Sequence, residues 1–448
     1  MSKQQKETKK KSLFVRFVTV TSVFHIFFLI YSQFMERDQG WASKKTRKRK
    51  LPEEEDRGML DLSFDELNQD LLEKVLAWLP TSSFCRLRSV CKRWSCVAES
   101  ATFLLACSQI PSRDPWFFMV DPNLDQSIVF DTAEKNWKNL NHSLHLQQNP
   151  GHNSIPVAAS GGLICFRTVS GEFVVCNPVT GAYRELPPVC TTNQSQTLDA
   201  IAMVSSANRS SYKLVLVCGD LPNLSAKVYD SGTNQWEEEI TLIRNTNRNS
   251  LESESSGDET LYFLSKAGDV VATNMQRSPS KQYSSVITVK DGEEIIYFLS
   301  STGTVVACNL AKKCFSEYPR LLPLYFEYSI DVIECRGEML LVVLSELLES
   351  ASLRVWRFSE ENRLWHQIAV MPPAMSHEFY GGKADINCVG YGDQILICVN
   401  STGTEFGSCF LCDLVTNGWI ELPKCFVNGK PREFMSAFSF EPRIEACV

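Results

Sequence analysis

Histidine is scarce in this sequence, with 6 residues among 448, and the common catalytic signatures are missing as well. The chain contains no GxGxxG, no GxxxxGK[ST] and no GxSxG motif, so it signals neither a nucleotide site nor a serine hydrolase. Cys409 and Cys412 form a lone CxxC, and two strand residues three apart point to opposite faces, which disfavours zinc binding. We therefore expect no catalytic residues, no cofactor and no metal ion.

A large excess of charge of one sign is also absent. The chain has 45 basic and 52 acidic residues, a net charge of -7, whereas a nucleic-acid-binding domain is strongly basic. The 17 cysteines are odd in number and lack the tight spacing of a small disulfide-rich fold, which favours a reducing compartment. What the chain does have is length and 44% apolar residues, enough for about two to four packed domains.

Residues 1–59 form an arm that differs from the rest of the chain. Its apolar stretch, residues 17–34, has no formal charge but contains several polar residues, and a membrane-spanning helix needs about 20 mostly apolar ones. Basic residues flank this stretch on both sides, so charge gives no orientation. Two interpretations stay open: a membrane anchor, or an extension that does not enter a membrane, including one that precedes a shorter chain starting at Met35.

A strongly charged run follows in the same arm. Residues 44–50 (KKTRKRK) include six basic residues, a composition typical of nuclear import signals. Residues 53–56 are acidic, so the two blocks also fit a solvated linker. The predicted location is the nucleus, the cytoplasm or both, with membrane anchoring through residues 17–34 as the less favoured alternative.

Residues 60–107 have the apolar spacing of three short helices. Asn68 is placed to cap the first helix and Pro80 to end it. The second helix carries an apolar stripe that ends at Trp94, and the third covers residues 95–106. A unit this small has too little core to be secure alone, so we expect it to need a partner or a neighbouring domain. The predicted apolar face of the first helix consists of Leu71, Leu72, Val75, Leu76 and Leu79.

These helices resemble an F-box. The resemblance is carried by the run LNQDLLEKVL (67–76), the pair Leu79-Pro80 and the run LRSVCKRW (87–94). Asn68 stands where the family usually has proline, but asparagine also begins helices well. The resemblance implies docking on a Skp1-type adaptor of a cullin-RING ubiquitin ligase. The residues it assigns to adaptor contact, or to supporting that contact from the module's own core, are Leu67, Leu71, Leu79, Pro80, Leu87, Val90 and Trp94.

In residues 114–448, short β-branched runs alternate with turns, which indicates many strands. One pattern recurs: a small apolar pair, then Asp or Asn, then an aromatic residue six positions on. The Asp or Asn side chain bonds the backbone two residues on and starts a hairpin turn, after which the aromatic residue enters the next strand. A Leu-Pro or Pro stop often follows. The predicted turn-starting positions are Asp131, Asn177, Asp230, Asn274, Asn309, Arg357 and Asp413, the fourth and sixth in looser copies.

The repeat length indicates a β-propeller. Consecutive turn positions lie about 47 residues apart on average, and propeller blades of the WD40 or kelch type have about 40–50 residues. Residues 259–275 nearly repeat residues 294–310, so seven hairpins mean either seven blades or six blades with an extra hairpin, and we favour six. The final strand, near residues 434–440, is expected to pair with the first blade and close the ring.

Two phrases of the repeat region, Asn-Pro-x-Thr-Gly and Glu-Leu-Pro, resemble those of plant F-box/kelch-repeat proteins. The kelch double glycine is clear once, at Gly161-Gly162. The expected fold is therefore multidomain, with a small all-α F-box over residues 60–107 followed by an all-β, kelch-type β-propeller over residues 114–448. Several cysteines precede the turns and are expected to be small core residues, namely Cys176, Cys308 and Cys412.

Together the resemblances imply a non-catalytic substrate-recognition adaptor of an SCF (Skp1–cullin–F-box) E3 ubiquitin ligase. The expected partners are a Skp1-type adaptor, a cullin reached through it, and a substrate protein bound by the propeller, with no nucleic acid. The sequence assigns no substrate-binding residues and leaves membrane contact open. The alternatives are an enzymatic, oxidase-like propeller and a membrane-anchored interaction protein outside a ligase.

Overall fold

The structure is a computed structural model, and it divides into two compact units, Met1–Leu79 and Pro80–Val448. The division falls inside the predicted helical module, whose later helices group with the strands. The boundaries 60–107 and 114–448 remain sequence-based predictions. The N-terminal arm, with residues 17–34 and 44–50, lies outside the described residues. These are 68–121, 127–140, 154–189, 197–206, 210–245, 262–264, 270–272, 283–300, 303–321, 328–347, 350–382, 384–400 and 407–448.

In the first unit, the described residues form helix α2 (Gln69–Ala77). As predicted, Asn68 caps it, because its side-chain oxygen accepts the backbone N–H of Asp70 at 2.9 Å. One predicted member of the apolar face is wrong: Leu71 lies roughly 90° round the helix from the buried stripe and is 49% exposed. The residues that are buried have the spacing i, i+3, i+4, i+7, and they are Leu72, Val75, Leu76 and Leu79.

The second unit begins with α3 (Thr81–Leu87), α4 (Lys92–Val97) and α5 (Ala101–Ser108). The predicted continuous helix up to Trp94 is wrong, because Cys91 is extended, with φ -153°, and begins α4. The predicted helix over 95–106 is wrong as well. Ser100 interrupts it, and its hydroxyl accepts the N–H of Phe103 at 3.5 Å to start α5. The apolar spacing runs on across both interruptions, which is why the sequence suggests longer helices.

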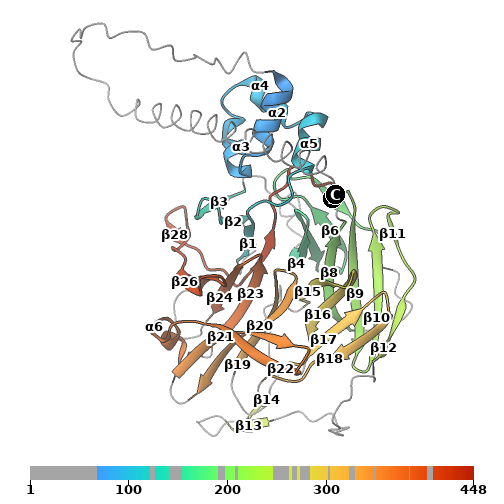
Figure 1. The fold of residues 1–448 in the computed structure, drawn as a ribbon, viewed down its shortest axis with the longest axis vertical. Coiled ribbons are helices and arrows are strands. Elements are labelled where there is room, and N and C mark those ends of the chain that lie inside the picture. The colour runs from blue at the N-terminus through green and yellow to red at the C-terminus, as the bar shows by residue number, and fades with distance from the viewer. Residues whose placement is uncertain are drawn as a thin grey trace, which may run out of the picture. The chain divides into compact units, whose positions relative to one another are not determined.

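In the described part of the chain, the strands group as six β-blades around one centre (Figure 1), which agrees with the favoured blade number. The third and fourth blades are joined in one nine-stranded sheet, because β12 (Ile240–Arg244) pairs in parallel with β18 (Cys314–Glu317). The first blade is β29 (Ser436–Phe440), β1 (Trp116–Val120), β2 (Ile128–Asp131) and β3 (Asn136–Asn139). The second is β4 (Ser154–Ser160), β5 (Leu163–Thr168), β6 (Phe173–Cys176) and β7 (Tyr183–Glu185). The third is β8 (Leu198–Ser205), β9 (Tyr212–Asp220) and β10 (Asn223–Asp230), with β11 (Gln235–Trp236) and β12 (Ile240–Arg244) both paired to β10.

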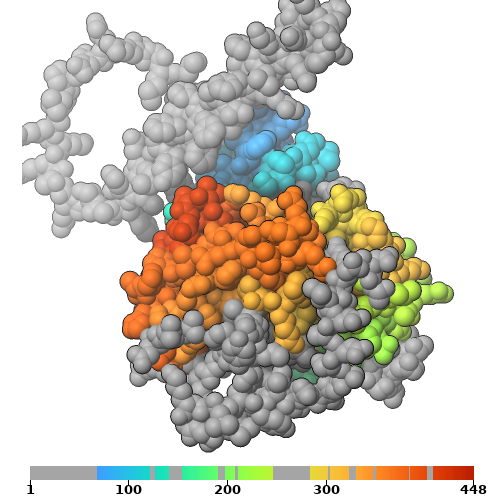
Figure 2. Space-filling model, turned by 60° about the horizontal axis from the view of Figure 1, so that its bottom comes forward, coloured from blue at the N-terminus to red at the C-terminus, as the bar shows by residue number. Residues whose placement is uncertain are grey.

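The remaining blades follow in chain order. The fourth is β15 (Ser285–Lys290), β16 (Glu293–Leu299), β17 (Val305–Asn309) and β18 (Cys314–Glu317). The fifth is β19 (Tyr328–Cys335), β20 (Glu338–Leu347), β21 (Ser350–Ser359) and β22 (Leu364–Val370). The sixth is β23 (Asp385–Tyr391), β24 (Gln394–Asn400), β25 (Ser408–Asp413) and β26 (Gly418–Glu421). Figure 2 shows the residues of the fifth and sixth blades (orange) as one continuous wall, with those of the fourth (gold) beside them.

The ring is closed by the last strand, as the sequence predicts. β29 pairs antiparallel with β1 in a register that sets Phe440 opposite Trp116 and Ser436 opposite Val120. Around the centre, neighbouring inner strands lie in the order β29, β4, β8, β15, β19, β23 and back to β29. Because the first blade takes strands from both ends of the propeller region, the ring cannot open without losing strand pairing.

The hairpin turns of the repeat are built as the sequence predicts. Oδ1 of Asp131 accepts the N–H groups of Ala133 and Glu134 at 3.0 and 3.1 Å. Asn177 and Asp413 start the corresponding turns of the second and sixth blades in the same way. The predicted start at Arg357 is wrong, because that residue is still inside β21, opposite His366. Asn274 lies outside the described residues.

Three tryptophans of the repeat join neighbouring blades. The indole N–H groups of Trp137, Trp236 and Trp365 each donate to a proline carbonyl oxygen at 2.8 Å. The acceptors Pro423, Pro187 and Pro319 are the predicted stops that end the preceding blades. The stop and the aromatic residue of the repeat therefore act as a pair across the blade boundary.

The duplicated segment explains why seven hairpins accompany six blades. Among the described strands, β13 (Tyr262–Leu264) and β14 (Val270–Ala272) pair with each other and with no other strand, whereas their sequence counterparts β16 and β17 belong to the fourth blade. A second small hairpin, β27 (Phe426–Val427) with β28 (Lys430–Pro431), connects the sixth blade to β29. Outside the blades, a short connection also holds α6 (Pro373–Ser376) and the 3₁₀ helix η3 (His377–Phe379).

Candidate adaptor-binding helices and the central cavity

Helix α2 and its C-cap residue Trp78 expose apolar side chains beside the buried stripe. Leu71 and Trp78 are seven residues apart, so they lie nearly above one another along the helix. Their exposed fractions are 49% and 62%, and Lys74 between them is exposed too. The resemblance pointed to Leu71 but missed Trp78, although Trp78 directly precedes the Leu79-Pro80 pair. Exposed aromatic and aliphatic side chains on one helix face are suited to a protein contact.

Two other residues assigned by the resemblance are buried. Leu79 is 4% exposed and Trp94 is 8% exposed, so neither offers a large contact surface. Pro80 is half-buried, and its carbonyl oxygen accepts the N–H of Phe84 at 3.0 Å as α3 begins. Leu67 lies outside the described residues.

The turn after α3 brings two of the assigned residues together. Leu87 ends the helix, and its carbonyl oxygen accepts the N–H of Val90 at 3.0 Å. Leu87 is half-buried, whereas the side chain of Val90 is 48% exposed. Lys92 next to this turn is exposed, so the surface combines apolar and basic groups. On α5, Leu105 is 61% exposed and had no sequence signal beyond its apolar character.

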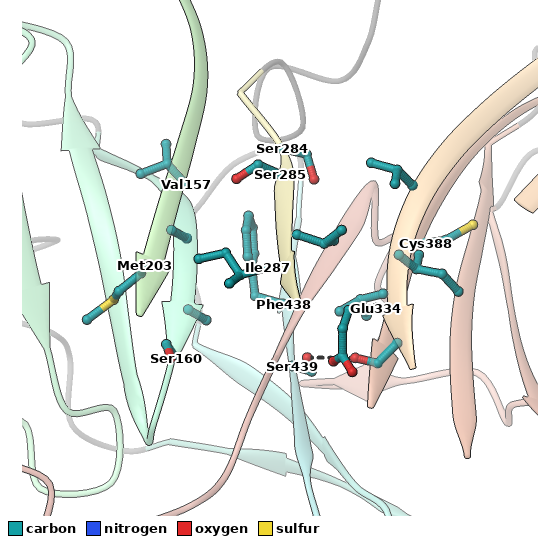
Figure 3. A pocket seen from close by; sticks show the side chains of 17 residues that line it. Val157, Ser160, Met203, Ser284, Ser285, Ile287, Glu334, Cys388, Phe438 and Ser439 are labelled. Atoms are coloured by element: carbon teal, nitrogen blue, oxygen red, sulfur yellow. Dashed lines mark hydrogen bonds between the residues drawn. The ribbon is translucent and has the colours of Figure 1, made fainter. Parts of the chain in front are cut away.

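The centre of the propeller contains a cavity of about 210 Å³ (Figure 3), lined by residues of all six inner strands. Its hydroxyl groups bond the backbone of neighbouring strands. Ser285 donates to the carbonyl oxygen of Ile201 at 2.8 Å, and Ser439 donates to that of Gly390 at 3.1 Å. These bonds join β15 to β8 and β29 to β23, so the polar lining contributes to the cohesion of the ring.

One carboxyl group lines the cavity, that of Glu334. It accepts the N–H of Gly337 at 2.6 Å, and burial raises the pKa of the carboxyl above its ordinary value although this hydrogen bond opposes the shift. The lining contains no lysine, arginine or histidine. The cavity therefore lacks the pair of titratable groups with opposed pKa shifts that acid–base catalysis uses.

The described ranges contain no group of three or more His, Cys, Asp or Glu side chains placed to hold a metal ion. In that same part of the chain, no helix is both long and apolar enough to span a bilayer. The predicted small core cysteines, Cys176, Cys308 and Cys412, are free thiols with 0% exposure. Burial raises the pKa of each thiol to about 12, which keeps them in the unreactive neutral form.

The comparison with known families agrees with this architecture. The model of the F-box domain matches residues 64–105, and the model described as KIB1-4 beta-propeller matches residues 129–375. The second match alone covers more than half of the chain. The fold is thus that of an F-box protein with a β-propeller, and the chain belongs to the KIB1-4 β-propeller family.

The chain is also similar to F-box proteins of Arabidopsis thaliana over more than four fifths of its length. F-box only protein 13 of Arabidopsis thaliana is 48% identical over 423 residues, which are 92% of each chain. F-box only protein 6 of the same plant is 25% identical over 82% of this chain and 72% of its own. An F-box/kelch-repeat protein of Arabidopsis thaliana is 26% identical over 85% of this chain and 89% of its own.

Proposed function

We propose that this protein is a non-catalytic substrate receptor of an SCF-type ubiquitin ligase. Its F-box helices dock on a Skp1-type adaptor and through it on a cullin, and its propeller binds the protein to be ubiquitinated. The receptor raises the local concentration of that protein near the charged ubiquitin-conjugating enzyme. The observation that carries this proposal is the F-box domain at residues 64–105 joined to a six-bladed propeller.

The exposed apolar side chains of the helices support the adaptor contact. A stable interface needs well-packed apolar anchors, and Leu71 with Trp78 on α2 and Val90 after α3 present such groups to solvent. Each is flanked by exposed basic residues, Lys74 on α2 and Lys92 on α4, which suits an adaptor surface with acidic groups at its rim.

The strand order supports one face of the propeller for substrate binding. Antiparallel blades place the short turns between first and second and between third and fourth strands on one face, the turn face. The connections between blades, including α6, η3 and the β27–β28 hairpin, then lie on the opposite face, the loop face. On the turn face, α3 already contacts the β2–β3 turn through Ser82 and Asp131. We therefore propose the loop face for the substrate protein, because rigid scaffolds carry binding residues on loops.

The test is capture of a purified Skp1-type adaptor by the full chain. Leu71→Asp and Val90→Asp place a charge at exposed positions, so the fold is retained while apolar contact is lost. We expect each to weaken capture at least tenfold, which corresponds to the loss of one apolar anchor. Leu79→Ala is a poor test, since this buried residue supports the helices themselves.

Ile243→Asp is the matched control. Ile243 is 70% exposed on β12 of the third blade, so it receives the same charge at a similarly exposed apolar position. This variant should capture the adaptor like the unmodified chain. A full chain that captures no adaptor, or Leu71→Asp and Val90→Asp chains that capture it normally, would overturn the proposal.

A further inference from the structure

Among the described blades, the turn residue of the repeat is almost fully buried in two. Asp230, Asn309 and Asp413 start their turns at partly exposed positions in the third, fourth and sixth blades. Asp131 and Asn177 start the same turns in the first and second blades but are 1% and 0% exposed. The repeat itself does not require this burial. On the turn face of the first two blades, other segments of the chain cover these side chains and bond their remaining polar atoms.

Asp131 binds helix α3. Its Oδ1 starts the turn, while its Oδ2 accepts the hydroxyl of Ser82 and lies 3.0 Å from Nζ of Lys138. One turn further along α3, the guanidinium of Arg86 donates to both oxygens of Glu134 at 2.5 and 2.9 Å. Lys138 also lies 2.6 Å from Glu134 and so links the two contacts. We call these five residues the clamp.

Asn177 binds the C-terminal tail, residues 441–448. Its side-chain amide donates to the carbonyl oxygens of Arg443 and Ala446 at 2.9 and 3.0 Å. Arg443 has 0% exposure, and its guanidinium donates to the carbonyl oxygen of Ile110, just after α5, at 3.1 Å. The tail therefore joins the end of α5 to the second blade. The hydroxyl of Thr81, at the start of α3, donates to the carbonyl oxygen of Pro442 at 2.6 Å, so the tail also contacts α3.

Helices α3 and α5, which contact the clamp and the tail, also pack against each other. The rings of Phe84 on α3 and Phe103 on α5 stack with centroids 4.8 Å apart, and both side chains are buried. A contact that fixes α3 is therefore transmitted to α5. Residues 109–115 are a short connection between α5 and β1, so they do not act as a long flexible tether.

We propose that the clamp and Arg443 are positioning residues that make α3–α5 and the propeller one rigid arm. This proposal rests on the proposed ligase function: the arm sets the direction in which the propeller is held from the adaptor, and thereby which lysines meet the ubiquitin-conjugating enzyme. A flexible joint would give a target many orientations and dilute productive ones, whereas a rigid joint retains the benefit of proximity.

The first test measures hydrogen exchange of the full chain. The variant Arg86→Ala/Asp131→Asn removes the Arg86–Glu134 ion pair and the carboxylate charge that accepts the Ser82 hydroxyl and pairs with Lys138. Asparagine still starts the turn, as Asn177 does in the second blade. We expect exchange in peptides covering residues 81–108 to become at least tenfold faster, with blades three to six unchanged. Lys312→Ala is the control, because Lys312 forms a comparable 2.6 Å ion pair with Glu293 far from the helices in sequence and in a different blade.

Unchanged exchange over residues 81–108, or equal acceleration in every blade, would overturn the clamp.

The second test reconstitutes the ligase with adaptor, cullin–RING subunits and conjugating enzyme, and maps the self-ubiquitinated lysines. The unmodified chain should use a restricted set, and Arg86→Ala/Asp131→Asn should use additional lysines at unchanged adaptor affinity, with Arg86→Lys in between. Identical maps overturn the positioning role. Failure of the unmodified chain to bind the adaptor overturns the ligase function instead, and the exchange result still decides the clamp.

Discussion

Gly162 shows how one missing side chain makes room for the C-terminal tail. Its φ is +96°, and a Cβ atom there would lie 2.9 Å from Cβ of Arg443 and 3.1 Å from the carbonyl oxygen of Glu441. We predict that Gly162→Ala lowers the free energy of unfolding by about 2–4 kcal/mol, from backbone strain and from displacement of the tail. Urea denaturation measures the change.

Gly337→Ala separates these two causes. Gly337 has a similar positive φ of +78°, but a Cβ atom there would meet nothing within 4 Å. It should therefore show only the backbone cost, about 1–2 kcal/mol. Equal losses for both variants would mean that crowding against the tail contributes nothing. The sequence marked Gly161-Gly162 as a kelch-like pair, but it gave no indication that residues nearly 280 positions away pass beside Gly162, since only the folded ring brings them together.

Glu134 makes part of the clamp dependent on pH. Hydrogen bonds from Arg86, followed by those from Lys138, lower the pKa of Glu134 to about 2 against burial, which raises it. A carboxyl with a depressed pKa contributes stability above its unfolded value near 4.5, and this is lost as the pH falls toward 2. We predict a loss on the order of 1 kcal/mol, reduced by the solvent exposure of Arg86. The difference in unfolding free energy between the unmodified chain and Arg86→Ala should therefore shrink from pH 6 to pH 3, and a constant difference would contradict it.

Three hydrogen bonds from a tryptophan indole to a proline carbonyl oxygen join neighbouring blades, and we call each of them a latch. Replacing Trp137, Trp236 or Trp365 with phenylalanine keeps an aromatic ring but removes the indole N–H that donates to the proline carbonyl oxygen. We predict a loss of about 0.5–1.5 kcal/mol for each latch, with additional loss of ring contact. Trp419→Phe is the control, because the Trp419 indole donates at 3.3 Å to Asn417 within its own exposed turn. If thermal unfolding shifts equally for all four, the latches have no special role.

The same elements show how far the sequence could predict the fold. Asp or Asn at the turn start has a local cause, a side-chain bond to the backbone two residues on, so these turns were predictable. The stop and the tryptophan were each visible, but their pairing joins consecutive blades and depends on the ring. The helix boundaries at Cys91 and Ser100 were missed because apolar spacing continued across them, while the capping bonds that end or start a helix leave a weak pattern.

The first and last strands of the propeller region, β1 and β29, pair in the first blade, and the C-terminal tail follows the closing strand β29. The sequence predicted the closing strand because blades repeat and one strand was left over. It did not predict that Arg443, three residues beyond that strand, would be fully buried between acidic partners and the connection after α5. A buried guanidinium needs partners for all its donors, and those partners come from segments more than 300 residues apart.

Two shortened chains test the separate contributions of the C-terminal tail and of the closing strand β29. A chain ending at Phe440 keeps β29 but loses the tail, so we expect a closed propeller with faster hydrogen exchange in residues 81–108. A chain ending at Met435 also loses β29, which exposes the pairing edge of β1 and removes the buried Phe438 and Phe440. Burying each phenylalanine contributes about 2–3 kcal/mol, and together with the lost strand pairing this approaches the whole stability of a typical domain. We therefore expect the second chain to lose its cooperative urea transition and the first to retain it. A cooperative transition in the chain ending at Met435 would show that closure by β29 is not what holds the ring.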